Sequence, residues 1–576
     1  MPLFADLHVG RTGLQAGQEA LNVVAHNVTN AETPGYVRQQ VQNAALRYNK
    51  IDVNTTGVAQ KQTGLGVNIA EVRQVRDRFL DASYREEFGR QGFYDVSYGA
   101  IEEIEEILGE LDGATFSDSV NSLWTAIEEL VKDPSSEVTQ SMLVQYAQSF
   151  VEAAHNVYQD FSDYQDKLNL KVRENVDRVN EIANKIWKLN EQIRAIETGG
   201  IENANDLKDQ RNRLMDELSG LGNTEFKNDA YGNVLVKFET HDLVLQDKTN
   251  VMSYMVDGDA GFYAVFWPDS AESFYDSFGN KVYKPDSAPV FDFSVEISSV
   301  KDTDVGELKA ALLARGDHRG TYQDLATEEA YTEQPKDARG RALTAHPAVQ
   351  DSIMMNTMAE FDGLVNKIVT AVNNVLKEHA DTKTGYLCTL ADQNDPTSYI
   401  PVELFQRGTC DLAEQVDDGL GNMVWQQTAE DPENSSTWYT SLGIIINQDL
   451  LQYPSHLSFM MPDGSVDYTT AKDLEKAFQE EKYTLNPTLT NGISIPEFYN
   501  AMVAQIANSG NIYMSLQEHQ KMTVESIEAS RQGTIGVSTD EELSNMIRFQ
   551  NAYNASSRYI NVIDEMLEHV INTLGS

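Results

Sequence analysis

The side chains that could carry chemistry are widely scattered in this chain. Its ten histidines do not cluster, and there is no HExxH motif, no phosphate-binding glycine loop ending in Lys-Ser/Thr, and no nucleophile elbow. The stretch "DGDAG" at 257–261 resembles the start of a calcium loop, but it lacks the later ligands and the terminal glutamate, so a turn is the better interpretation. The sequence therefore predicts no catalytic residue, no cofactor and no metal site.

The two cysteines, Cys388 and Cys410, are separated along the chain and form no CxxC pair. Because no cluster of histidines lies near them in the sequence, the pattern argues against zinc. Two free thiols and a disulfide within one loop-rich insertion both remain open, and we favour free thiols.

Composition and charge exclude several classes of partner. A chain of 576 residues is long enough for three or four domains, and its hydrophobic content of 41% is ordinary for a globular protein. No apolar run approaches the ~18 residues of a membrane span, and the first residues lack the features of a secretory signal peptide. The formal charge of −45 opposes binding to nucleic acid or to an anionic membrane. We expect a cytosolic protein or one exported by a signal-independent route.

Heptad patterns at the two ends are the sharpest feature of the sequence. The N-terminal pattern steps by four and three through Leu3, Leu7, Gly10, Leu14, Gly17, Leu21, Val24 and Val28. The C-terminal pattern runs through Met546, Phe549, Tyr553, Ser556, Ile560, Ile563, Leu567, Val570 and Leu574. Such seams favour packing between helices, and glycine on a seam allows a close approach. We expect the two helices to pack on each other; the alternative is two unrelated amphipathic helices lying on a core.

The stretch "HNVTNAETPGY" at 26–36 predicts the end of the first helix, since asparagine tolerates helix-ending conformations and Pro-Gly favours a tight turn. Apolar periodicity predicts further helices at 115–133, 172–196, 205–220, 354–375 and 495–506, with Asn205 or Asp206 capping the third. Strands are predicted at "GNVLVKF", at "GFYAVFW" and over 291–297, where apolar and polar residues alternate.

The predicted fold is mainly α with β insertions, a long helical bundle or coiled coil made from paired N- and C-terminal helices with inserted β-rich regions. The predicted division is an N-terminal helix at 1–45, a helical body at 46–223, a β-rich region at 224–300, a loop and long helix of the body at 301–380, an irregular β insertion at 381–460, more helical body at 461–535, and a C-terminal helix at 536–576.

Both ends of the chain resemble the signatures of bacterial flagellar rod, hook and hook-associated proteins, in "GLQAGQEALNVVAHNVTNAETPGYVRQ" and "GVSTDEELSNMIRFQNAYNASSRYINVIDEMLEHVI". Three internal stretches are similar to the hook-associated members that join hook and filament: "TGLGVNIAEVRQVRDRFLDASYR", "ANDLKDQRNRLMDELSGL" and "GELKAALLARG". The resemblance implies that 1–45 and 536–576 pair as axial helices in the wall of a tube, and that 381–460 is an outer domain.

The resemblance also implies a non-enzymatic structural adaptor in the extracellular flagellum. Copies would form a ring on the hook protein and present a platform for the second junction protein and then flagellin, with the cap protein nearby. Export would use the flagellar type III apparatus without a cleaved signal peptide, and a cytosolic chaperone would hold the C-terminal helix beforehand.

The functional residues under this hypothesis are contact residues on the terminal helices. The candidate assembly residues are Leu7, Gly10, Leu14, Gly17, Leu21, Val28, Met546, Tyr553, Ile560, Ile563 and Leu567. One alternative is a hook or distal-rod protein of the same family, against which the internal "DLKDQRNRL" helix argues. The other is a flagellar muramidase or protease in 224–460, which would need a pair of carboxylates or a metal cluster that the sequence does not reveal.

Overall fold

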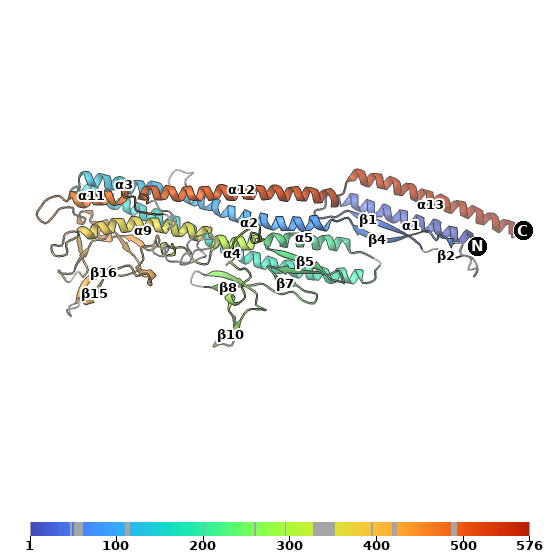
Figure 1. Ribbon diagram of the computed structural model, residues 1–576, viewed down its shortest axis with the longest axis horizontal. Helices are drawn as coiled ribbons and strands as arrows, with labels where there is room; N and C mark the ends of the chain where they lie inside the picture. The colour runs from blue at the N-terminus through green and yellow to red at the C-terminus, as the bar shows by residue number, and fades with distance from the viewer. Residues whose placement is uncertain are drawn as a thin grey trace.

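The computed structural model shows a long, narrow molecule whose two termini lie at the same tip (Figure 1). It describes residues 2–46, 49–50, 62–109, 116–200, 202–257, 261–293, 295–325, 352–392, 395–417, 423–484 and 492–574. Helices dominate and strands form small antiparallel sheets beside them. The predicted class, mainly α with β insertions and with paired terminal helices, is confirmed. Among the described residues, no helix is both long and apolar enough to cross a bilayer.

The tip with the termini consists of α1 (Pro2–Thr29), α13 (Thr539–Leu574) and a hairpin between them and the rest of the chain. The hairpin pairs β1 (Gln39–Ala45) with β4 (Val67–Gln74), and the short strands β2 (Asn49–Lys50) and β3 (Gln62–Thr63) extend it. We call α1, α13 and this hairpin the end unit. Sequence analysis missed the hairpin and placed a boundary at residue 46 between helical segments, because its strands are rich in glutamine and asparagine and lack clear apolar alternation.

The middle of the molecule holds one hydrophobic core between helices and a meander of strands. Its helices are α2 (Arg78–Leu108), part of α4 (Glu137–Glu197), α5 (Asn205–Leu221) and α6 (Glu307–Arg315). Its strands are β5 (Thr224–Asn228), β6 (Val234–Phe238), β7 (His241–Val244), β8 (Ser253–Asp257), β9 (Phe262–Phe266), β10 (Ser273–Tyr275) and β11 (Lys281–Tyr283). We call this part the middle core.

Glycines bring three helices of the middle core into backbone contact. The Gly306 N–H at the start of α6 donates to the Gly89 carbonyl of α2 at 2.8 Å. A Cβ on Gly306 would lie 2.4 Å from the Cα atom of Gly222, just beyond α5. Gly306 also has φ +95°, a conformation that side-chain-bearing residues rarely adopt. The close approach of these helices therefore depends on this position having no side chain.

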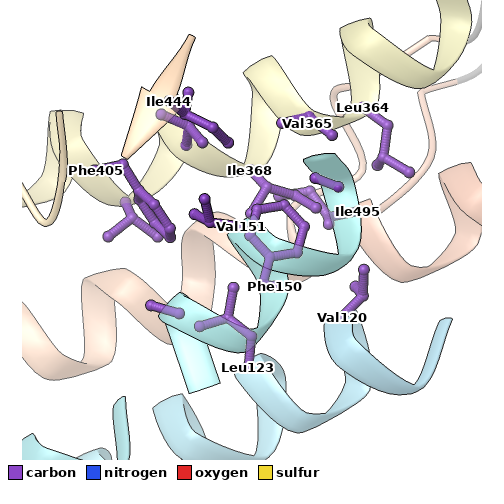
Figure 2. Close-up of a cluster of buried hydrophobic side chains, with 14 of the residues drawn as sticks. Val120, Leu123, Phe150, Val151, Leu364, Val365, Ile368, Phe405, Ile444 and Ile495 are labelled. Atoms are coloured by element: carbon purple, nitrogen blue, oxygen red, sulfur yellow. The ribbon is translucent and has the colours of Figure 1, made fainter. Parts of the chain in front are cut away.

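The end opposite the termini holds a larger core, the distal core, and Figure 2 shows part of it. There Phe150 of α4 lies among side chains from α3 (Phe116–Lys132), α9 (Ile353–His379) and α12 (Ile495–Ile535). The remaining elements of this end are β12 (Cys388–Leu390), β13 (Tyr399–Pro401), β14 (Phe405–Arg407), β15 (Ala413–Asp417), β16 (Met423–Gln427), β17 (Ile444–Ile446), α10 (Gln448–Gln452) and α11 (Tyr468–Gln479).

Two helices connect these parts. The 61-residue α4 places buried side chains in both cores, from Leu143 to Leu168 in the distal core and from Val172 to Ile186 in the middle core. The 41-residue α12 begins with a capping box between Ser494 and Glu497 in the distal end and returns along α2 to the end unit.

Two local predictions were wrong. The described residues of the predicted strand at 291–297, which are 291–293 and 295–297, are not in a strand. Instead, the Thr303 hydroxyl donates to the Glu296 carbonyl and accepts from the Ser298 N–H, so side-chain bonds replace a sheet ladder. Neither Asn205 nor Asp206 caps α5, because the cap position is Ala204 and the Asn205 amide donates to a carbonyl of β4 instead. Most of the predicted loop at 315–350 lies outside the described residues.

A buried carboxylate in the distal core predicts a measurable pH dependence. Glu360 of α9 accepts hydrogen bonds from Gln505 and Asn356 through Oε1, while Oε2 has no partner among the described residues. Burial raises its pKa from 4.5 to about 7. Because the pKa of Glu360 is higher in the folded than in the unfolded chain, protonated Glu360 favours the folded state. This contribution to the free energy of unfolding is complete below pH 4.5 and is lost as the pH rises through 7.

We therefore expect Glu360→Gln to stabilise the chain at pH 8, by roughly 1–3 kcal/mol, and to change its stability little at pH 4.5. Urea denaturation at the two pH values measures this. The exposed Glu378→Gln on the same helix is the control and should change stability little at either pH. A gain that is equal at both pH values would contradict the role of Glu360 ionisation.

Candidate assembly interface

The terminal helices α1 and α13 pack antiparallel through glycines. A Cβ on Gly10 would lie 2.7 Å from Cγ1 of Ile560. Two turns further along α1, a Cβ on Gly17 would lie 3.3 Å from the Cα atom of Tyr553. The residue numbers of the contacts on α13 thus decrease as those on α1 increase, so the two helices run in opposite directions. Because the backbone of Tyr553 itself is close, the helices could not pack this tightly with a larger residue at position 17.

The fully buried face of α1 is made of small residues rather than leucines. Its buried side chains are those of Thr12, Ala16, Ala20, Val23, Val24 and Asn27. The candidate residues Leu7, Leu14, Leu21 and Val28 are only half-buried in the single chain. They therefore retain apolar surface on one side of the end unit that nothing in the described part of this chain covers.

On α13, the candidate residues form the side that faces α1, and apolar residues also occupy the outer side. Met546, Tyr553, Ile560 and Leu567 are half-buried and Ile563 is only 3% exposed. The exposed apolar side chains are those of Leu543, Ile547, Tyr559, Val562, Met566, Val570 and Ile571. Four of them, Tyr559, Val562, Met566 and Val570, follow at steps of three and four and so form one exposed row on the helix. An exposed apolar row of this kind is typical of a protein–protein contact surface.

A polar cluster fixes the corner where α1, β1 and α13 meet. The Asn27 amide donates to the Glu542 carboxylate at 3.1 Å and to the Gln39 carbonyl, and its oxygen accepts from the Tyr36 hydroxyl at 2.8 Å. Arg38 pairs with Glu542 at 2.8 Å, and the Arg38 N–H donates to the carbonyl at the end of α12. Burial and nearby carboxylates raise the pKa of Tyr36, so it stays a hydroxyl donor.

Sequence reasoning missed this corner cluster. It treated the Asn27 segment as a helix end, and nothing in the local pattern showed that Glu542, 515 positions away, would be its partner. The available signal was three acidic residues in the first turn of α13, of which one is almost fully buried.

A carboxylate of α5 joins the end unit to the middle core. Asp209 accepts from the Val37 N–H at 3.2 Å and from the Gln74 amide at 2.7 Å. Burial raises the pKa of Asp209 to about 7. Apart from such polar ties, the end unit stands apart from the body, since no residue of α1 or α13 belongs to either core cluster.

The cysteines and the acidic side chains form no chemical site within the described residues. Cys388 and Cys410 are free thiols, both partly buried, and burial raises the pKa of Cys388 to about 11. Residues 258–260 of the predicted turn at 257–261 lie outside the described residues. Within the described ranges, no group of three His, Cys, Asp or Glu side chains could hold a metal ion.

Comparison with known proteins gives matches at both ends and through the body. The model "Flagellar hook-associated protein FlgK helical domain" matches residues 101–277. Models described as "Flagella basal body rod protein" and "Flagellar basal body rod FlgEFG protein C-terminal" match 7–36 and 525–574. Flagellar hook-associated protein 1 of Bacillus subtilis is 24% identical over 583 residues, which cover 99% of this chain and 98% of that protein. The chain is thus similar to flagellar hook-associated protein 1 along nearly its whole length.

A second relative is similar over almost the same length, and a solved structure shares the fold. Flagellar hook-associated protein 1 of Escherichia coli is 23% identical, with 97% of this chain and 98% of that protein covered. The solved structure of the flagellar hook junction protein FlgK from Burkholderia pseudomallei has the same fold, with a TM-score of 0.51 and 12% identity over 79% of this chain and 100% of that chain. These similarities identify the chain as a structural component of the bacterial flagellum.

Proposed function

We propose that copies of this chain form a ring between the hook and the filament, without enzymatic activity. The observation that carries this proposal is the end unit. Its two helices pair through glycines, retain half-buried leucines on α1 and an exposed apolar face on α13, and contribute nothing to either core. Such a unit is built to be completed by neighbouring subunits.

In this arrangement, the candidate residues from Leu7 to Val28 and from Met546 to Leu567 line contacts within the tube wall. The strand-rich regions at 224–300 and 381–460 lie on the same side of the long helices and would face outward (Figure 1). The hook protein would contact one side of the ring, and the second junction protein, followed by flagellin, would add to the other, with the cap protein nearby. A hook or distal-rod role is less well supported, because the match at 101–277 is to the hook-associated helical domain.

We further propose export through the flagellar type III apparatus to the extracellular flagellum. Before export, the apolar outer face of α13 would be exposed in the cytosol. A chaperone with an apolar groove would cover a helix face of this kind.

Deletion of the gene from the native cells tests the proposal. We expect cells with hooks but no filaments, and flagellin monomers in the medium, because the platform for flagellin would be missing. Electron microscopy and immunoblotting of the medium measure these outcomes. Re-expression of the full chain is the control, and normal filaments on the deletion strain would contradict the proposed role.

A further inference from the structure

A large polar cleft lies where the end unit meets the middle core. It has a volume of about 1180 Å³ and is formed by β4, the start of α2, α5 and β5. Seven basic and six acidic side chains line it, so their formal charges sum to +1 (7 − 6), whereas the whole chain carries −45. We call it the basic cleft. The net charge of its lining is thus opposite in sign to that of the whole chain.

The floor of the basic cleft contains a buried cation that forms no ion pair with any described residue. Arg211 of α5 is 6% exposed. Its Nη1 atom donates to the Asn190 side-chain oxygen at 2.8 Å and to the Gly232 carbonyl at 3.2 Å. Its Nε atom and the buried Nη2 atom of Arg85, which also lines the cleft, have no hydrogen-bond partner among the described residues. A buried charge is costly unless it is paired, so the floor favours a bound anion.

Arg211 remains a cation at neutral pH. Burial, with the positive charges of Arg76 and Arg85, outweighs the opposing charge of Glu197 and lowers the pKa of Arg211 to about 10, which is still well above 7. Within the described ranges, Asp81 forms an ion pair with Arg76, and Glu197 forms one with Lys208. Glu197 therefore acts on Arg211 through its charge, without a direct ion pair.

The rim of the basic cleft adds exposed cations. Arg73, Arg78 and Lys227 are exposed, and none has an ion pair within the described part of the chain. Of the lining carboxylates, Glu86 and Asp302 pair with Arg90. Glu71 and Glu225 are exposed and, like the three cations, have no ion pair within the described part of the chain. The rim thus carries three free cations against two free carboxylates, and Arg211 adds a further cation at the floor.

The size and position of the cleft decide what occupies it. A single inorganic anion is much smaller than the cleft, whereas several side chains of a protein surface would fill it. In a ring of identical copies, the surface beside the cleft belongs to another copy, and a chain with a net charge of −45 presents mostly carboxylates. Charge complementarity therefore favours a second copy of this chain.

We propose that the basic cleft, with Arg211 on its floor and Arg78 and Lys227 on its rim, binds acidic side chains of a neighbouring copy of this chain. This inference rests on the proposed ring. It adds a charged contact in the body to the apolar contacts of the end unit, and it explains why cations gather at one place in an acidic chain.

Photo-crosslinking in assembled flagella tests which protein occupies the basic cleft. A photoreactive amino acid replaces Lys227, hook–filament preparations are irradiated, and the products are analysed by gel and mass spectrometry. We expect a product of twice the mass of the chain, with the captured peptide rich in Asp and Glu. The same photoreactive residue in place of the exposed Lys281 on β11 is the control and should give at least about tenfold less of this product.

Charge reversal tests whether the contact matters. The rim variant Arg78→Glu with Lys227→Glu should keep the unfolding midpoint, since both side chains are exposed, but should reduce incorporation into the junction about tenfold by like-charge repulsion. The matched variant Lys281→Glu with Lys284→Glu should incorporate normally.

The outcomes separate the two proposals. Chains present in hook–filament preparations that crosslink at position 227 to a different protein, or not at all, would overturn the cleft inference and leave the ring in place. Normal incorporation of the rim variant would overturn it as well. Absence of the wild-type chain from these preparations would overturn both.

Discussion

Cells that carry Leu14→Asp are expected to keep their hooks but to grow at least about tenfold fewer filaments, with flagellin monomers in the medium. Leu14 is half-buried on α1, and the proposed ring would cover its remaining surface. Burial of an unpaired carboxylate there costs several kcal/mol or displaces the helix. Filament counts by electron microscopy measure the effect.

The body should not respond to the same change. Neither core contains a residue of α1, so the main unfolding transition of purified Leu14→Asp should match that of the wild type. Gln18→Asp is the control, since Gln18 is exposed on the same helix and should be mild. Normal filaments in Leu14→Asp cells would mean that this side of α1 is not buried in the flagellum. Loss of the main transition would mean that α1 supports the body.

Replacement of Gly306 by alanine should lower the free energy of unfolding by about 3 kcal/mol or more. Two effects add at this position. The backbone has φ +95°, and the new Cβ would lie 2.4 Å from Gly222 Cα and 2.7 Å from the Leu221 carbonyl oxygen. Relief of this overlap would move α6 away from α5 and break the Gly306 bond to Gly89. Urea denaturation followed by tryptophan fluorescence measures the loss.

Substitution of a second glycine distinguishes the effect of backbone strain from the effect of a close contact. Gly279 has φ +82°, but nothing lies within 4 Å of the position its Cβ would take. Gly279→Ala should therefore cost only about 1 kcal/mol. If the two variants lose equal stability, the contact between α5 and α6 is not as tight as described.

Elements with a strong local period were predictable from the sequence. The terminal helices, α9 and the strands β6 and β9 carry clear apolar periodicity and are where the pattern placed them. The spacing also indicated that Gly10 and Gly17 would allow a close helix contact, and both face α13. The assembly role of these residues stays a prediction.

Features that depend on distant partners were not predictable. The alternation at 291–297 is as regular as that of a strand, but the side chain of Thr303 takes the hydrogen bonds that a sheet would supply. Asparagine is a favoured residue type at helix caps, yet the side-chain amide of Asn205 donates a hydrogen bond to a carbonyl of β4. Arg211 reads as one more basic residue of an amphipathic helix, and only the fold shows that it is buried without a carboxylate. Local periodicity carries no information about such contacts.

The continuity of α4 through both cores has a mechanical consequence. At 61 residues and 1.5 Å per residue, the helix spans roughly 90 Å without a break. Side chains from one uninterrupted backbone anchor each core, so any twisting or sliding of one core against the other must bend or strain this helix. A subunit placed in a rotating shaft would therefore pass torque along its length as a stiff rod, and any bending would be concentrated at the polar ties of Asp209 to the end unit.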